Sequence, residues 1–263
     1  MGLYRRLIIN LSKSKMVFRA NYLLSTLFSF FYIFLQVFIW KGLYGNSSDW
    51  NGIRLNEMIA YTILSSMTLM LVKSNLMKNL NAEVQDGSIS IRLLLPHGFR
   101  SYYFKSNLSE NMLWSIYNSL PPIIVAIVVF GLEFNFSVIQ LFGYILAVVL
   151  AFLMNFSYSF FMGLAVMWFR NAYFLENIDE LVFKLFSGTI IPMWLFPLWL
   201  DSTSRVLPFR YMIFEPLSIL LGKTPPNEYI NVYLIQLVWC VVLFALMQLV
   251  WYKARKKIMI QGG

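Results

Sequence analysis

Six long apolar runs dominate the chain, and each is close to the roughly 20 residues that a helix needs to cross a bilayer. Their apolar residues are nearly continuous and lack the spacing of an amphipathic helix, which argues against a soluble fold. Only 13% of the residues are charged. We therefore predict an all-α polytopic membrane protein with a single transmembrane domain over residues 1–263. Its six transmembrane helices are expected at about 22–40, 55–72, 112–130, 139–168, 181–200 and 232–252.

Lys and Arg gather in alternate segments between these runs, and this bias predicts the orientation of the chain. With the amino terminus inside, the inner segments hold 16 basic residues and the outer segments hold 5. Short cytoplasmic loops carry an excess of Lys and Arg. We expect a multi-pass protein of the cytoplasmic membrane with both termini in the cytoplasm. The net charge of +9 then reflects these loops and their contact with membrane lipids, and we expect no nucleic-acid partner.

The segment before the first run is basic and has its own apolar periodicity. Leu3, Leu7, Ile8 and Leu11 recur at helical spacing, with Lys and Arg between them. A basic amphipathic helix lies in the plane of the membrane interface, where its cations meet anionic head groups. Residues 1–20 are therefore predicted to form an interfacial helix, with a disordered basic tail as the alternative.

The longest inner loop contains a turn signal, Asp86 followed by Gly87, and then an apolar stretch that ends at Pro96. Glu83 precedes the turn and Arg92 follows it. The pattern predicts a short amphipathic helix flanked by turns, which is a form that docks into a groove on a partner. A plain structural connector is the alternative.

The fifth run contains residues that break helices. Gly188, Pro192 and Pro197 lie inside it, and proline removes a backbone donor and kinks or ends a helix. The freed backbone groups must find partners in neighbouring protein or water. We expect a broken helix at the outer leaflet that forms a short re-entrant hairpin, with Trp194 and Trp199 near the outer interface. A simple proline kink is the alternative.

The outer loop that follows, over residues 206–222, is unusually apolar for an exposed connection. Exposed apolar segments of a membrane protein avoid water by contacting lipid or protein. This loop is therefore expected to pack against the membrane surface or to dip into it.

Several kinds of chemistry lack the residues that they need. One cysteine, Cys240, and one histidine, His97, supply neither a disulfide nor a histidine-based catalytic or metal site. The chain has no Gly-x-x-x-x-Gly-Lys-Ser/Thr loop for ATP phosphates. Ionisable residues fall near the ends of the runs, whereas an ion-coupled carrier keeps them near the midplane. We expect no enzyme activity and no bound cofactor, and expect the energy to come from a separate ATPase.

Four features, in this order along six spans, resemble the type-2 permeases of ATP-binding cassette exporters, in the bacterial drug and antibiotic export subgroup. They are the interfacial amino-terminal helix and the stretches 86–96, 187–197 and 207–222. The resemblance implies a coupling helix that docks on the ATPase and an outer hairpin that closes the pathway. The implied coupling residues are Glu83, Asp86, Gly87, Ile89, Leu93, Leu94 and Pro96, and the implied gate residues are Gly188, Pro192, Trp194, Pro197 and Trp199.

The resemblance also implies the partners and the cargo. Two permeases would face each other above an ABC ATPase dimer that holds ATP and Mg, and we favour two different permeases over two identical ones. The cargo would be a hydrophobic or amphipathic molecule, such as a drug, antibiotic, lipid or peptide-like compound, that moves out across the membrane. A non-transporting membrane scaffold or assembly subunit, which would bind no ATPase, is the alternative function.

Overall fold

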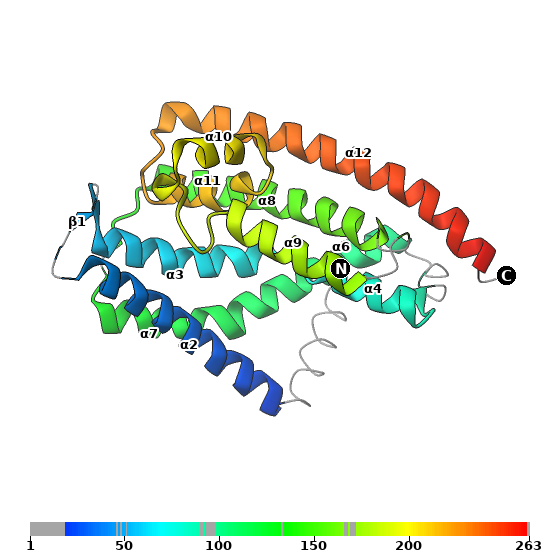
Figure 1. Cartoon of the computed structure of the whole chain (residues 1–263), viewed down its shortest axis with the longest axis horizontal. Coiled ribbons are helices and arrows are strands. Elements are labelled where there is room, and N and C mark those ends of the chain that lie inside the picture. The colour runs from blue at the N-terminus through cyan, green and yellow to red at the C-terminus, as the bar shows by residue number, and fades with distance from the viewer. Residues whose placement is uncertain are drawn as a thin grey trace.

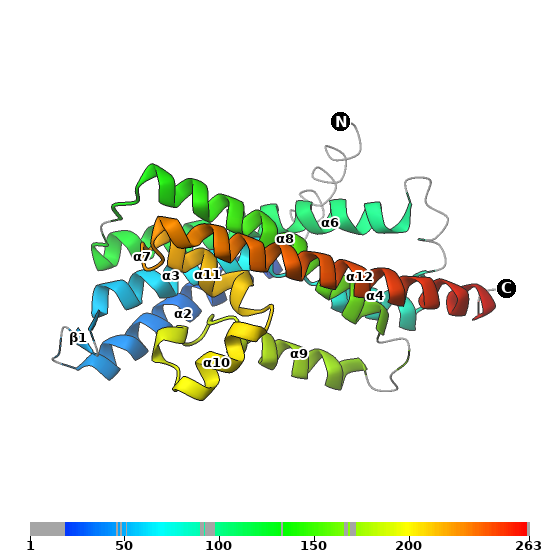
Figure 2. The ribbon, with the colours of Figure 1, turned by 90° about the horizontal axis from the view of Figure 1, so that it is seen from above.

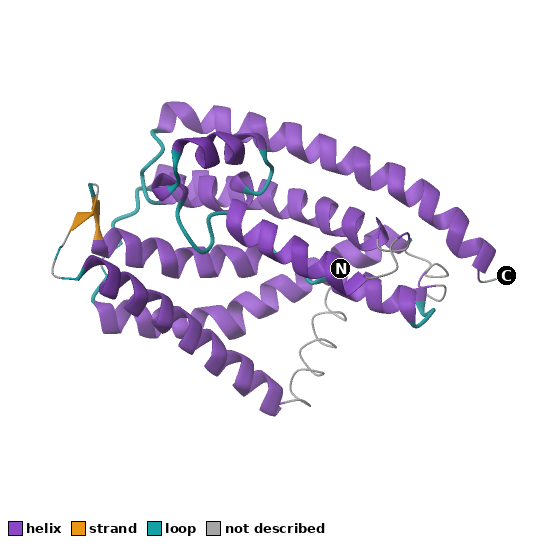
Figure 3. Cartoon of the chain, viewed as in Figure 1, coloured by secondary structure: helices purple, strands orange, loops and turns teal. Residues whose placement is uncertain are grey.

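Helices make up most of the described chain (Figure 3). The computed structural model describes residues 19–261 apart from 46, 48, 51, 90, 91, 93–97, 133, 166, 167 and 169–171. Nearly all of the predicted interfacial helix lies outside the described residues. The main helices are α2 (Arg19–Tyr44), α3 (Leu55–Val72), α4 (Leu76–Gln85), α6 (Phe99–Trp114), α7 (Leu120–Phe130), α8 (Val138–Ala165), α9 (Ala172–Phe186), α10 (Leu198–Val206), α11 (Arg210–Leu220) and α12 (Tyr229–Gln261).

The long helices run along the longest axis of the molecule, so the bundle has two distinct ends (Figure 1). One end carries a small antiparallel pair of strands, β1 (Asp49–Trp50) and β2 (Ile53–Arg54), and is called the hairpin end below. The other end carries α4 and the end of α12, and is called the α4 end. Seen from above, α9 and α10 lie along one side of the bundle and α6 along the opposite side (Figure 2).

Five helices of the described chain are long and apolar enough to cross a bilayer, which makes this a multi-pass membrane protein. Their outward faces are apolar, as lipid contact requires; on α2, for example, Leu27, Phe28 and Phe31 are all exposed. These helices correspond to five of the six predicted spans. They are Leu23–Tyr44, Leu55–Val72, Phe99–Phe130, Val138–Ala165 and Pro226–Lys256.

The predicted fifth span differs most from the structure, because no continuous helix covers 181–200. Helix α9 begins nine residues earlier than that range and ends at Phe186. Gly188 then takes a left-handed conformation (φ +77°), which ordinary residues avoid. A short 3₁₀ turn at Met193–Leu195 follows before α10. The helix is thus broken where the glycine and prolines predicted, while the count of six crossings stays a prediction.

The predicted third span is longer than expected, since the helix begins at Phe99 and runs to Phe130. A π-helical turn at Ser115–Ser119 joins α6 to α7, and the N–H of Leu120 bonds the carbonyl of Ser115. Pro121 and the proline after it have no N–H, so the carbonyls four residues earlier lose their α-helical partners. This loss explains the wider turn at this point.

Helix α8 is the centre of the bundle and packs against α4, α11 and α12. Small residues on its buried side allow close approach. An added Cβ at Gly143 would lie 2.9 Å from Ile219 on α11, and one at Gly163 would lie 2.8 Å from Leu80 on α4. The main core cluster therefore lies between α8, α11 and α3, toward the hairpin end.

Candidate functional site

Helix α4 is amphipathic and lies against the bundle by one face. Leu76, Met77 and Leu80 are buried against neighbouring helices. The polar residues Lys78, Asn79 and Gln85, outside this buried face, are exposed, as is Ala82. An exposed polar face on a helix that is otherwise fixed to the bundle is a surface that a partner can contact. Helix α4 ends at Gln85, before the turn at Asp86. The amphipathic helix that the sequence predicts after that turn falls mostly outside the described residues, so it stays a prediction.

Glu83 fixes the end of α4 to the start of α6. Its carboxylate accepts a hydrogen bond from the hydroxyl of Tyr103 and forms an ion pair with Arg92, 3.3 Å from Nε to Oε1. The Arg92 guanidinium also lies over the ring of Tyr102, 5.0 Å from its centroid. Glu83, which the sequence placed among the docking residues, is therefore engaged inside the protein and positions α4.

The turn after α4 is exposed, while the residue that follows it is buried. The carboxylate of Asp86 accepts a hydrogen bond from the Ser88 backbone N–H at 2.9 Å, and hydrogen bonds from Ser88 hold the pKa of Asp86 below its usual value. Gly87 adopts φ +76°. Ile89 is buried in the cluster around Leu80. Asp86 and Gly87 are thus accessible to a partner, and the predicted coupling residues Leu93, Leu94 and Pro96 lie outside the described residues.

Two of the predicted gate residues, Gly188 and Trp194, contact the same residue of α3, Tyr61. The Tyr61 hydroxyl donates a hydrogen bond to the carbonyl oxygen of Gly188 at 2.7 Å. The Trp194 ring lies edge-on to the Tyr61 ring, with centroids 4.9 Å apart, and Phe214 of α11 contacts both rings. The sequence did not single out Tyr61 or Phe214. Tyr61 shares its span with Thr62, Ser65, Ser66 and Thr68, so its hydroxyl alone gave no signal for this contact.

The other predicted gate residues, Pro192, Pro197 and Trp199, lie at the ends of short helical segments and take no part in the contact with Tyr61. Pro192 caps the short 3₁₀ turn, and Pro197 immediately precedes α10. Leu198 and Trp199 begin α10 with side chains that are 87% and 70% exposed. The apolar ring of Trp199 is therefore available to lipid or to another subunit.

The apolar loop over 206–222 is largely a buried helix. Helix α11 packs against α3, α8 and α12, and most of its residues are buried. Helices of the same chain cover α11, so little of it is left to contact lipid, and the expectation that this loop packs against the membrane surface or dips into it stays a prediction. Around α11, the lipid that the sequence pattern suggested is replaced by protein, and hydrophobicity alone does not distinguish the two.

A buried arginine anchors α11 to α10, and the sequence interpretation missed it. Arg210 bonds Asp201 at 2.5 Å, Glu215 at 2.6 Å and Ser204 at 2.9 Å. Its guanidinium also lies 4.8 Å from the centroid of the Phe214 ring. A lone arginine between aromatic residues, with acidic residues on both sides in the sequence, was the available signal. The chain reverses between α10 and α11, and this ion cluster holds the reversal.

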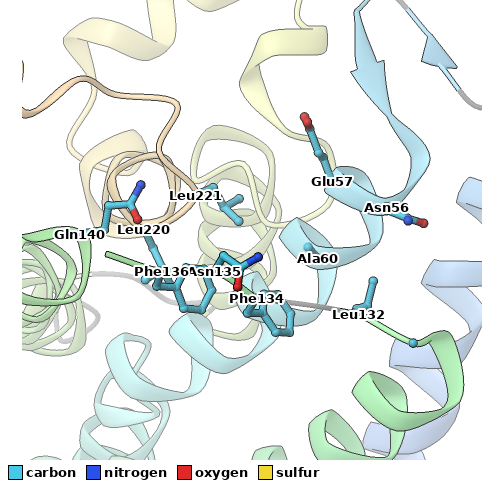
Figure 4. Close-up of a pocket in the computed structure, with 11 residues that line it drawn as sticks. Asn56, Glu57, Ala60, Leu132, Phe134, Asn135, Phe136, Gln140, Leu220 and Leu221 are labelled. Atoms are coloured by element: carbon cyan, nitrogen blue, oxygen red, sulfur yellow. The ribbon is translucent and has the colours of Figure 1, made fainter. Parts of the chain in front are cut away.

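A shallow pocket of about 340 Å³ opens at the hairpin end. Figure 4 shows it between the first turn of α3, the loop before α8 and the end of α11. Glu57, on its rim, pairs with Lys223 of the loop that leads toward α12. The described residues contain no cluster of His, Cys, Asp and Glu able to hold a metal ion. Nothing in this pocket forms a set of catalytic groups.

Comparison with known proteins gives one match. A family model described as "ABC-2 family transporter protein" matches residues 30–262. No curated protein and no solved structure matches the chain significantly. The match covers four of the described transmembrane candidates in full and, because it begins inside α2, only part of Leu23–Tyr44.

Proposed function

Because this chain belongs to the ABC-2 transporter family, we propose that it is the permease subunit of an ABC exporter that moves a hydrophobic or amphipathic molecule out of the cell. The observation that carries the proposal is α4, an amphipathic helix with an exposed polar face that Glu83 ties to the bundle. A permease without its own ATP site needs such a surface to receive motion from an ATPase that holds ATP and Mg.

The proposed orientation places the α4 end in the cytoplasm and the hairpin end outside. The bias of Lys and Arg toward the segments at the α4 end supports it. Helix α9 then supplies the sixth crossing. Its 15 residues span only about 22 Å at 1.5 Å per residue, so the turns after Phe186 complete the passage to the outer side.

The proposed gate is the segment between α9 and α11. Helices α10 and α11, joined by the chain reversal at Arg210, form the outer re-entrant pair in this proposal. Gly188 and Trp194 close against Tyr61, so a change in the position of α3 or α9 has to break or move this contact. The proximity of these three residues supports a gate at this place.

Proposed coupling passes through the exposed parts of α4 and its turn. Ala82, Asp86 and Gly87 are exposed and form the docking surface for the ATPase. The ion pair and hydrogen bond of Glu83 carry a displacement of α4 to α6. A second permease completes the transporter, and we favour a different chain over an identical one.

Purification from native membranes in a mild detergent tests the proposal. The tagged chain should bring down an ABC ATPase in a fixed ratio. Ala82→Arg should lower the recovery of that ATPase at least tenfold, because a long charged side chain blocks close docking. Ser202→Arg, a matched change at an exposed position of α10, should not. Recovery of intact wild-type chain without any ATPase would favour a membrane scaffold instead.

A further inference from the structure

A second pocket, of about 360 Å³, lies at the α4 end between α3, α4, α6 and α9, and is called the lysine pocket below. One wall is apolar and includes Tyr32, Leu69, Met70 and Trp114. The opposite wall is strongly charged. Its ionisable residues are Lys73, Lys78, Glu110, Glu176, Asp179, Glu180 and Lys184. A site with one apolar and one charged wall suits a molecule that is itself amphipathic.

Part of the charged wall is neutralised within the protein. Glu180 pairs with Lys184 at 2.8 Å and with Lys78 at 3.5 Å. These three residues therefore form a closed set of ion pairs. They fix the edge of α9 against α4, and two cations on one carboxylate leave a net charge of +1 at this edge.

Two other carboxylates of the pocket, Glu176 and Asp179, accept hydrogen bonds from neutral groups. Glu176 accepts a hydrogen bond from the Asn81 side-chain amide at 2.7 Å. Asp179 accepts one from the hydroxyl of Tyr158. Neither carboxylate forms an ion pair with a described cation. Two negative charges beside the pocket thus lack a positive charge in contact.

Lys73 is the complementary case, a cation without an anion in contact. Its ammonium lies over the Phe183 ring, 4.7 Å from the centroid, and makes no ion pair or hydrogen bond within the described residues. Burial lowers the pKa of Lys73. An ammonium has three donors to satisfy, and leaving them unmet in a partly buried place costs free energy. The unsatisfied ammonium therefore lies at a position that lines the pocket, where a ligand could supply its partner.

We propose that the lysine pocket binds an amphiphile whose head carries both signs of charge. The anionic part of the head, a phosphate or a carboxylate, pairs with Lys73. Its ammonium part faces Glu176 and Asp179, and its apolar chain lies along Tyr32 and Trp114. A purely anionic head would meet the carboxylates of Glu176 and Asp179, and a purely cationic head would meet Lys73, so a zwitterion complements the wall best.

Binding of the amphiphile in this pocket does not depend on the ATPase. The identification of that amphiphile as the cargo rests on the proposed function. At the proposed cytoplasmic side, the pocket would accept a molecule from the inner leaflet. The binding experiment below uses the permease alone. Its failure would leave the proposed function standing, and a failure to recover an ATPase would leave the binding site standing.

The test measures binding to the full chain in dodecyl maltoside micelles, whose heads are uncharged. The probe is radiolabelled dodecyl phosphoethanolamine, which has a zwitterionic head. Dodecyl phosphate, dodecyl trimethylammonium and tailless phosphoethanolamine are the competitors. We expect saturable binding of the probe and weaker competition by all three. Tight competition by the tailless head would overturn the need for an apolar chain, and equal competition by dodecyl phosphate would overturn the zwitterionic head.

Variants assign the binding to the charged wall. Glu176→Gln keeps the size of the side chain, and Lys73→Gln shortens it but keeps it polar. Each removes one charge and should weaken binding by about tenfold, as the loss of one charged hydrogen bond does. Lys73→Arg should retain most of the affinity. The matched control is Lys41→Gln, because Lys41 lies over Phe130 at the same 4.7 Å but at the hairpin end. Unchanged affinity in Lys73→Gln, or an equal loss in Lys41→Gln, would overturn the site.

Discussion

The hydroxyl of Tyr61 donates a hydrogen bond of 2.7 Å to the carbonyl oxygen of Gly188, 127 positions further along the chain. Tyr61 is one of the largest fully buried side chains of the protein, and this bond joins the middle of α3 to the turn after α9. The turn at Gly188 has left the helical pattern, so its carbonyl has no helical partner. The Tyr61 hydroxyl therefore supplies the hydrogen-bond donor that the broken helix does not provide.

Tyr61→Phe should destabilise the protein by about 1–3 kcal/mol, because the buried Gly188 carbonyl loses its partner. Thermal unfolding in detergent measures the change. Tyr32→Phe is the control, since the Tyr32 hydroxyl only accepts a bond from Gln36 on an exposed face, and it should alter stability by less than about 0.5 kcal/mol. Equal effects of the two variants would contradict the role of the Tyr61 bond.

Gly188→Ala should cost more than Gly131→Ala. Both glycines have positive φ, +77° and +59°, so alanine at either position pays about 1–2 kcal/mol for the left-handed conformation. Only at Gly188 would the new Cβ also meet a neighbour, 2.9 Å from the Tyr61 hydroxyl, whereas nothing lies within 4 Å at Gly131. In the double variant Tyr61→Phe, Gly188→Ala, the contact with the hydroxyl is removed and the contact of 3.2 Å with Cβ of Phe214 remains. The combined loss should therefore be smaller than the sum of the two single losses. Additive losses would show that the two residues act separately.

Arg210→Met should destabilise the protein by about 3–5 kcal/mol, because removing one partner of a buried ion cluster leaves its carboxylates unpaired. Arg205 is a stringent control. It pairs with the same Asp201, at 2.9 Å, but its side chain is 65% exposed, so Arg205→Met should cost no more than about 1 kcal/mol. Chemical unfolding followed by near-ultraviolet circular dichroism distinguishes the two. Similar losses would mean that burial of Arg210 does not matter.

Lys73→Met should stabilise the protein while it weakens binding in the lysine pocket. Burial lowers the pKa of Lys73 below 10.5, so the unfolded chain holds this proton to a higher pH than the folded chain does. Between the lowered value and 10.5, unfolding takes up a proton, and the wild-type protein gains stability as the pH rises.

The charged groups that surround Lys73 are Asp179, Glu180, Lys184 and Lys78, and none of them is changed in the methionine variant. Melting temperatures of wild type and Lys73→Met should therefore converge as the pH approaches 10.5. A constant difference across that range would indicate that the methionine acts through packing alone. A lower melting temperature in the variant at neutral pH would contradict the cost assigned to the buried charge.

Much of the architecture could be predicted because bilayer crossing leaves a strong local signal. The spans at 55–72 and 139–168 agree with α3 and α8 to within a few residues. The break at Gly188 also follows from local chemistry, since glycine and proline act on their own backbone. The start of α6 at Phe99 was missed, because its first turns are polar and a hydropathy pattern does not distinguish a polar helix from a loop.

Features that depend on distant contacts could not be predicted in the same way. The burial of α11 arises from α3, α8 and α12, which lie far from it in the sequence. Glu83 could be recognised as a notable loop residue, but its partner Tyr103 lies on the next helix. Lys73 has no acidic neighbour in the sequence. Its proposed role in binding could be recognised only in the structure, where the carboxylates of α9 line the same pocket.

The π-helical turn at Ser115–Ser119 has a mechanical consequence for the helix that contains it. Helices bend most readily at such turns, and here one polar residue, Asn118, accepts hydrogen bonds from Ser25 and Thr26 of α2. The half before the turn is attached to α4 through Tyr103, and the half after it packs against α2. One continuous rod is thereby divided into two segments with a fixed point between them, so that a tilt of the first changes the angle of the second instead of pushing it along its axis.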